Sequence, residues 1–155
     1  MKRLPTIAMT ALLLLAGCTS GETEPQDSWR LLASDVTATV YNATRAQCND
    51  DCLHTASMME IHPDRIAAQR ILAMERTMMA EYGLSYGAIV RIEGAGACDG
   101  VWQLQDTMNR RFAGQHKIDL LVDESVRHGR WTDVTLYVAA DAPTAERYAR
   151  SLEGS

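Results

Sequence analysis

Short runs in which apolar and polar residues alternate recur along the chain, and they constrain its fold more than any other feature. In Asp35–Tyr41 the alternation and the β-branched residues predict a strand with Val36, Ala38 and Val40 on one face. Polar or glycine-containing segments separate this run from similar ones further along. These occur at Ile71–Met74, Ala88–Glu93, Val101–Gln105, Ile118–Val122 and Thr132–Ala139. The pattern predicts about six short strands.

Helical signals are few and short. We expect small helices or helical turns within 60–69, 76–82, 123–129 and 142–152. Pro63 and Pro143 lie near the expected starts of two of them, where a missing N–H costs nothing. Because these helices do not alternate regularly with the strands, the pattern disfavours a doubly wound sheet. A mainly β fold is expected, a small six-stranded β-barrel with short helices.

The N-terminus has the features of a processing signal. Met1–Arg3 is basic, and Ile7–Leu15 is apolar but too short to span a bilayer stably. The following Leu15-Ala16-Gly17-Cys18 resembles the lipobox of bacterial lipoproteins, which implies cleavage before Cys18 and a lipid on its thiol. The alternative is an ordinary signal peptide with an incidental cysteine. Thr19 stands where an inner-membrane retention signal would have Asp, which favours the outer membrane.

The rest of the chain divides into a tether and one domain. We expect residues 1–17 to be the signal peptide, 18–28 a flexible polar tether and 29–155 a single folded domain with one core. The formal net charge of −5 becomes about −7 without Lys2 and Arg3, so nucleic acid is not an expected partner.

Three cysteines follow Cys18, namely Cys48, Cys52 and Cys98. In an oxidising periplasm we expect two of them to form a disulfide, and the sequence leaves the pairing open. The alternative is a metal site that also uses His54, but this spacing matches no common zinc pattern. We therefore expect no metal and no cofactor.

The stretch Gln105–Asp123 carries the candidate chemistry. Asp106 ends one apolar run, Asp119 lies inside the next, and a basic, glycine-containing loop joins them, which suggests a carboxylate site for a polar ligand such as a sugar. Burial in an apolar run and a nearby like charge would both raise the pKa of Asp119, as a general acid requires. The alternative is architectural: Asp106 accepts backbone N–H bonds, and Asp119 pairs with an arginine. The candidate arginines are Arg110, Arg111 and Arg130.

Several segments, in order, resemble a three-aspartate domain. They are Thr39–Asn42, Thr55–Ser57, Ile71–Arg76, Tyr86–Gly94, Gln105–Arg110, Ile118–Leu120 and Val134–Val138, within roughly residues 35–139. That domain is similar to the double-psi β-barrel of rare lipoprotein A and of the membrane-bound lytic transglycosylase A family. The resemblance implies Asp119 as the single catalytic acid and base, with Asp106 beside it. Glu75 stands where the family has its third aspartate.

The resemblance also implies a partner, a reaction and a location. The partner would be a peptidoglycan glycan strand, cleaved intramolecularly to give anhydro-sugar ends by a lytic transglycosylase on the periplasmic side of the outer membrane. Because the loop after Asp106 reads Thr107-Met108-Asn109 and not the family's glycine-rich start, the alternative is a non-catalytic lipoprotein. It would bind glycan or an envelope protein.

Other candidate substrate-binding residues surround this pair. Arg110 and Arg111 could contact peptidoglycan carboxylates or balance local charge. Trp102 could stack on a sugar ring or pack in the core. Glu75 completes the expected binding set.

Overall fold

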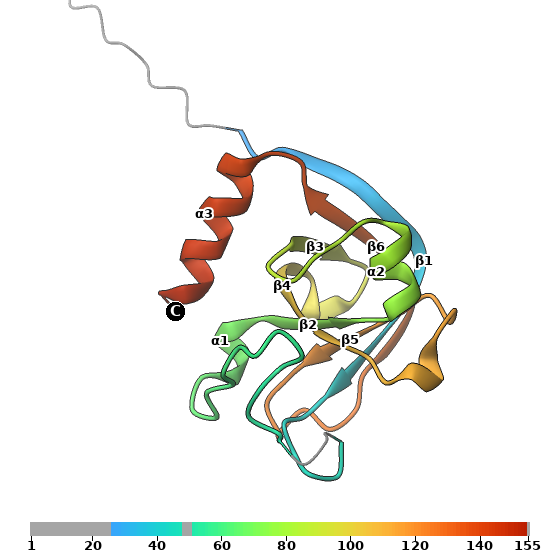
Figure 1. The fold of residues 1–155 in the computed structure, drawn as a ribbon, viewed down its shortest axis with the longest axis vertical. Helices are drawn as coiled ribbons and strands as arrows, with labels where there is room; N and C mark the ends of the chain where they lie inside the picture. The colour runs from blue at the N-terminus through green and yellow to red at the C-terminus, as the bar shows by residue number, and fades with distance from the viewer. Residues whose placement is uncertain (1–25, 48–50, 155) are drawn as a thin grey trace, which may run out of the picture.

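The strands close into a six-stranded barrel. A computed structural model describes residues 26–47 and 51–154. Around the barrel the strand order is β1-β5-β2-β4-β3-β6 (Figure 1). The strands are β1 (Trp29–Tyr41), β2 (Ile71–Met74), β3 (Ile89–Glu93), β4 (Gly100–Thr107), β5 (Lys117–Leu121) and β6 (Arg130–Ala139). The expected mainly β fold, a six-stranded barrel with short helices, is confirmed.

Two strand pairs are parallel and the rest are antiparallel. β1 pairs with β5, and β2 pairs with β4, in the same direction. Parallel neighbours cannot be joined by a hairpin, so each pair is linked by a long excursion of the chain. The two strands of each parallel pair are therefore neighbours in the barrel but far apart in sequence.

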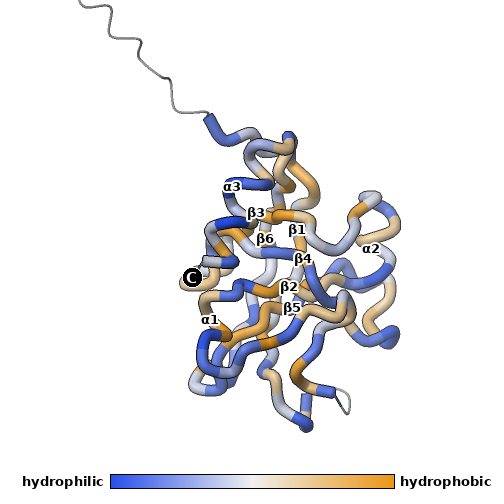
Figure 2. Tube along the Cα trace, turned by 60° about the vertical axis from the view of Figure 1, so that its left-hand side comes forward, coloured by the Kyte–Doolittle hydropathy of each residue, from blue (hydrophilic) through white to orange (hydrophobic). Residues whose placement is uncertain are grey.

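The alternating residues fill the barrel interior. Val36 and Ala38 of β1 are fully buried, as are Val134 and Leu136 of β6. Val36 and Ala38 were expected on one face of their strand, and this face is directed into the core. β2 is short and buried at every position, which explains why it reads as a continuous apolar run. Figure 2 shows hydrophobic residues along β2 and β5, whereas the loops below them are largely hydrophilic.

The helices lie outside the barrel. They are α1 (Ile66–Gln69), α2 (Arg76–Glu81) and α3 (Ala142–Glu153), with two 3-10 turns, η1 (Gly96–Cys98) and η2 (Arg110–Phe112). α2 and α3 lie on opposite sides of the barrel (Figures 1 and 2). Within the described residues no helix is long and apolar enough to cross a membrane.

The segment 123–129, expected to form a helical turn, is instead an extended loop with one tight turn. The buried side-chain amide of Asn42 donates to the carbonyl oxygens of Val122 at 3.1 Å, of Asp123 at 3.0 Å and of Val126 at 3.3 Å. These bonds hold the loop around a single side chain. The long-range contact overrides the local helical preference.

The two ends of the domain meet at α3. Asp27, just before β1, forms an ion pair with Arg147 and accepts a hydrogen bond from the Tyr148 hydroxyl. The ring of Tyr148 also packs against that of Trp29, with centroids 5.3 Å apart. The C-terminal helix is thereby fastened beside the point where the chain enters the barrel.

Candidate functional site

The two candidate aspartates lie in one row across four neighbouring strands. Thr39 of β1 is paired with Asp119 of β5, Asp119 with Ala73 of β2, and Ala73 with Asp106 of β4. We call these four residues the cross-strand row. Because Ala73 has only a methyl group, no long side chain separates the two carboxylates within the row.

An irregularity in β4 brings Asp106 into this row. Leu72 is paired with Leu104, but the next residue, Ala73, is paired with Asp106, so Gln105 is an extra residue in β4. A regular register would place Gln105 opposite Ala73 and turn Asp106 to the other face. The bulge is therefore the local feature that directs the Asp106 side chain to the site.

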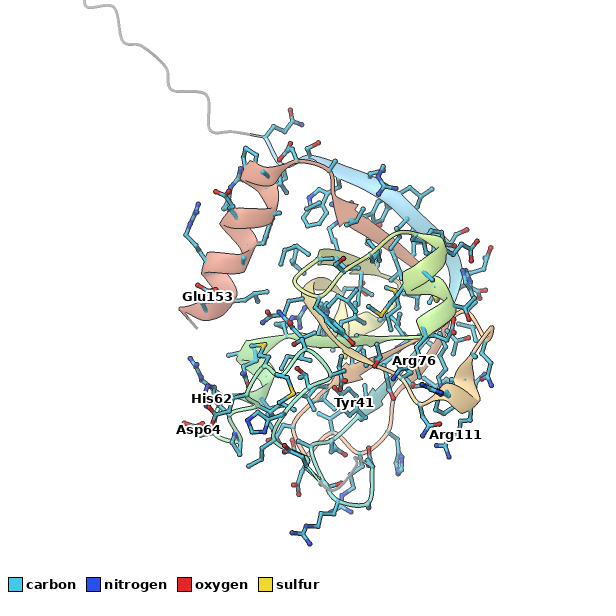
Figure 3. The ribbon with its side chains drawn as sticks, in the orientation of Figure 1. Tyr41, His62, Asp64, Arg76, Arg111 and Glu153 are labelled. Atoms are coloured by element: carbon cyan, nitrogen blue, oxygen red, sulfur yellow. The ribbon has the colours of Figure 1, made fainter. Side chains whose placement is uncertain are left out.

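Three members of the cross-strand row line a surface pocket of about 820 Å³. They are Asp119, Ala73 and Asp106, and further lining residues come from the loop after β1, the start of α2 and the loop between β4 and β5. In Figure 3, Arg76 and Arg111 lie toward the right of the view, His62 and Asp64 lie toward the left, and Tyr41 lies between the two groups. The volume is in the range of pockets that hold small ligands.

Asp119 has the electrostatic character of a general acid. Burial raises the pKa of its carboxyl group, and the negative charge of Asp106 adds to this effect. The Thr39 hydroxyl donates to Asp119 Oδ1 at 2.8 Å and, like the positive charge of Lys117, lowers the pKa, but the net effect of all these groups is a raised pKa. The result is a carboxyl group that faces the pocket and holds its proton more readily than a solvated aspartate.

Asp106 makes a different set of contacts. Its Oδ1 accepts N–H bonds from Ala56 at 3.0 Å and from Thr107 at 2.8 Å, and its Oδ2 accepts a bond from the Tyr41 hydroxyl at 3.0 Å. These donors hold the loop around Ala56 against the end of β4. These bonds match the architectural alternative for Asp106, in which its carboxylate accepts backbone N–H bonds.

No ion pair joins either aspartate to an arginine among the described residues. Arg110 and Arg111 do line the pocket, as does Arg76, but Arg130 does not. The architectural alternative for Asp119, a salt bridge to one of these arginines, therefore has no counterpart in residues 26–47 and 51–154. The Asp119 carboxyl is held by the Thr39 hydroxyl instead.

Comparison with known proteins finds no match, either to a protein-family model or to a curated protein. The geometry of the pocket is therefore the basis for any assignment of function.

Glu75 and Trp102, two of the expected binding residues, are not brought to the pocket. Glu75 is buried and caps α2, where it accepts N–H bonds from Thr77 at 2.6 Å and from Met78 at 3.1 Å. Burial alone would raise the Glu75 pKa, but together these and other hydrogen bonds lower it. Trp102 is only 2% exposed and lies in the core, where its indole N–H donates to the Cys98 carbonyl oxygen.

The structure describes two of the three cysteines from which a disulfide was expected. Cys98 is a free thiol whose pKa is raised by burial. Cys52 lines the pocket, whereas Cys48 and the expected lipidation site Cys18 lie outside the described residues, as does the predicted signal peptide. In the described part of the chain no group of three or more His, Cys, Asp or Glu side chains could hold a metal ion.

Sequence reasoning gave no role to three residues that shape the site. Thr39 and Tyr41 contact the two aspartates from β1, and Arg76 lines the pocket from the start of α2. Alternation does place Thr39 and Tyr41 on one face of their strand, opposite the core face. The parallel pairing of β1 with β5, which brings that face to Asp119, leaves no local signal.

Proposed function

We propose that the chain is a lipid-anchored envelope protein whose barrel, similar to that of the three-aspartate domain, cleaves peptidoglycan glycan strands as a lytic transglycosylase. It would be anchored through Cys18 in the outer membrane and face the periplasm. The observation that carries the proposal is the state of Asp119: a carboxyl group with a raised pKa, oriented by Thr39 and open to a pocket.

The reaction needs one group that first gives and then takes a proton. In the first step protonated Asp119 donates to the glycosidic oxygen as the bond to the anomeric carbon breaks. The sugar's own 6-hydroxyl then attacks that carbon and closes the anhydro ring, and its proton passes to the Asp119 carboxylate. Asp119 ends protonated as it began, and no enzyme nucleophile is required, unlike in retaining glycosidases, where a second carboxylate attacks the sugar.

The surroundings of Asp119 suit both halves of this cycle. The Thr39 hydroxyl lies 2.8 Å from Asp119 Oδ1 and 3.4 Å from the carbonyl oxygen of Ile118. It can donate to the carboxylate when Asp119 is ionised and turn to the carbonyl oxygen when Asp119 is protonated. The Asp106 charge favours the protonated form at the start of the cycle.

The test is the release of soluble products from purified sacculi. Wild-type protein should release fragments with anhydro-sugar ends, and Asp119→Asn should abolish this release. Asp35→Asn is a matched control, because Asp35 is exposed on β1 and Asn tolerates its positive φ of 57°. Equal release by wild type and Asp119→Asn would exclude Asp119 as the acid.

A second candidate is a non-catalytic lipoprotein that binds glycan or an envelope protein. The contacts of Asp106 favour it, because three donors occupy its two oxygens and fix a loop. This candidate predicts that wild-type protein sediments with sacculi and releases no anhydro products.

A further inference from the structure

Three arginines border the pocket from two separate elements. Arg76 is the first residue of α2, which follows β2 directly, and Arg110 and Arg111 form the start of η2, between β4 and β5. The two elements follow the strands that carry Ala73 and Asp106 of the cross-strand row. Cationic groups are therefore delivered to the same pocket as the two carboxylates.

None of these arginines has a carboxylate partner in the described part of the chain. Arg91, Arg147 and Arg150 each form an ion pair with an acidic residue, but Arg76, Arg110 and Arg111 do not. The guanidinium of Arg111 instead lies 4.7 Å from the ring centroid of Phe112. In a chain with 20 acidic and 15 basic residues, acidic partners are not scarce.

A neutral sugar does not require three cations around its binding site. An arginine guanidinium presents a planar set of N–H donors that matches the two oxygens of a carboxylate. We propose that Arg76, Arg110 and Arg111 form a carboxylate clamp, so that this pocket selects glycans that carry carboxylate groups over neutral ones. The inference rests on the proposed function for the identity of the ligand as a glycan.

Peptidoglycan offers this chemistry from two sources. One is the lactyl carboxylate on the muramyl ring, which is free only where the peptide has been removed. The other is the set of carboxylates on attached peptides. The clamp requires a carboxylate from one of these two sources, and the experiment below distinguishes them.

The experiment measures binding of the full chain to insoluble sacculi by co-sedimentation at low temperature. Four preparations are compared. They are intact sacculi, sacculi stripped of peptides by an amidase, and each of these two materials with its carboxyl groups converted to amides. Binding should fall by about tenfold or more on amidation and weaken with salt. Stronger binding to stripped sacculi would assign the lactyl carboxylate, and stronger binding to intact sacculi the peptide carboxylates.

The variants locate the effect at the pocket. Arg76→Gln should weaken binding to unmodified sacculi by about threefold, within the range for a single exposed pair, and the triple Gln variant by about tenfold or more. Arg30→Gln is the matched control, since Arg30 is exposed on β1, lies outside the pocket and carries the same charge. All variants should match the wild type in thermal unfolding, because the replaced side chains are exposed.

Unchanged binding after amidation, or equal losses for Arg76→Gln and Arg30→Gln, would overturn the clamp, as would a failure to bind sacculi at all. The clamp and the proposed reaction can be contradicted by different results. Carboxylate-dependent binding without anhydro products would remove the catalytic proposal and keep the clamp. Equal product release from amidated and unmodified sacculi would do the reverse.

Discussion

Asp119 and Asp106 lie in the same cross-strand row, and their neighbours give them different properties. Asp119 is largely buried on β5 and receives a hydrogen bond from the side chain of Thr39. Asp106 has two backbone N–H donors and the Tyr41 hydroxyl. Two carboxyl groups in one pocket with contrasting environments favour a division of roles, with one group moving a proton and the other holding structure.

At this scale Thr39 should set the pH range of the activity. Thr39→Val removes a hydrogen bond that stabilises the ionised form, so the already raised pKa of Asp119 should rise further. In the proposed reaction product release requires protonated Asp119, so the alkaline limb of its pH profile should move to higher pH. Initial rates measured from about pH 4 to about pH 9, the range in which carboxyl and histidine groups titrate, would show the shift.

The control for this change is Thr37→Val, two residues earlier on the same strand, where the threonine side chain does not contact Asp119. An unmoved alkaline limb in Thr39→Val would contradict the assignment of Asp119 as the titrating acid.

Asp119 should also cost the protein stability at neutral pH. A carboxyl whose pKa is raised on folding destabilises the fold above its folded pKa, and this cost is absent below its unfolded pKa. Asp119→Asn should therefore raise the melting temperature at pH 7, because the neutral amide does not carry this cost. The gain should disappear in acid. Asp35→Asn should show neither effect in the same calorimetric scans.

At the scale of elements, the sequence predicted those features that depend on residues close together in the chain. Alternation identified the inner face of β1, and the helix expected within 76–82 is present as α2, which ends at Glu81. β1, however, starts at Trp29 and not at Asp35, because it pairs with β6 from Trp29 to Thr39 through several register shifts. Asp35 itself has a φ of 57°, so the expected strand start is an irregularity within a longer strand.

The candidate site was predictable only in part for a related reason. Asp106 and Asp119 were identifiable because each interrupts or ends an apolar run. Their partners Thr39 and Ala73 depend on strand pairing, and Asp106 depends on a bulge in β4, which no local pattern in this chain announces.

A substitution at Glu75, the N-cap of α2, can distinguish a structural role of this residue from a role in substrate binding. Glu75→Ala removes the cap of α2 and should destabilise the protein by about 1–2 kcal/mol. Because the folded pKa of Glu75 is lowered, the stability it contributes is present above its unfolded pKa and is lost as pH falls through its folded pKa. Urea unfolding at neutral and acidic pH would show a difference from wild type that shrinks in acid.

Glu81→Ala, at the other end of α2, should have a much smaller effect on unfolding, because Glu81 is exposed. Sacculus binding measured on folded Glu75→Ala protein should equal that of wild type. A selective loss of binding would restore Glu75 as a substrate-binding residue.

At the scale of the whole molecule, the barrel brings the ends of the domain together at α3. Asp27→Asn removes the negative charge that pairs with Arg147 and accepts from Tyr148, so it should loosen α3 while the barrel stays closed. Hydrogen exchange should quicken in residues 142–153 and stay unchanged in β2 and β5. Glu153→Gln, an exposed change on the same helix, should leave exchange as in wild type.

Closure of the barrel also determines when the site comes into being during folding. The four residues of the cross-strand row belong to four strands, and two of the strand contacts involved are parallel pairings of segments distant in sequence. Such contacts form late, after long loops have closed. Until then Asp119 remains solvated and has the acidity of an ordinary aspartate. A newly made chain would therefore lack the proposed acid until its last strands had joined.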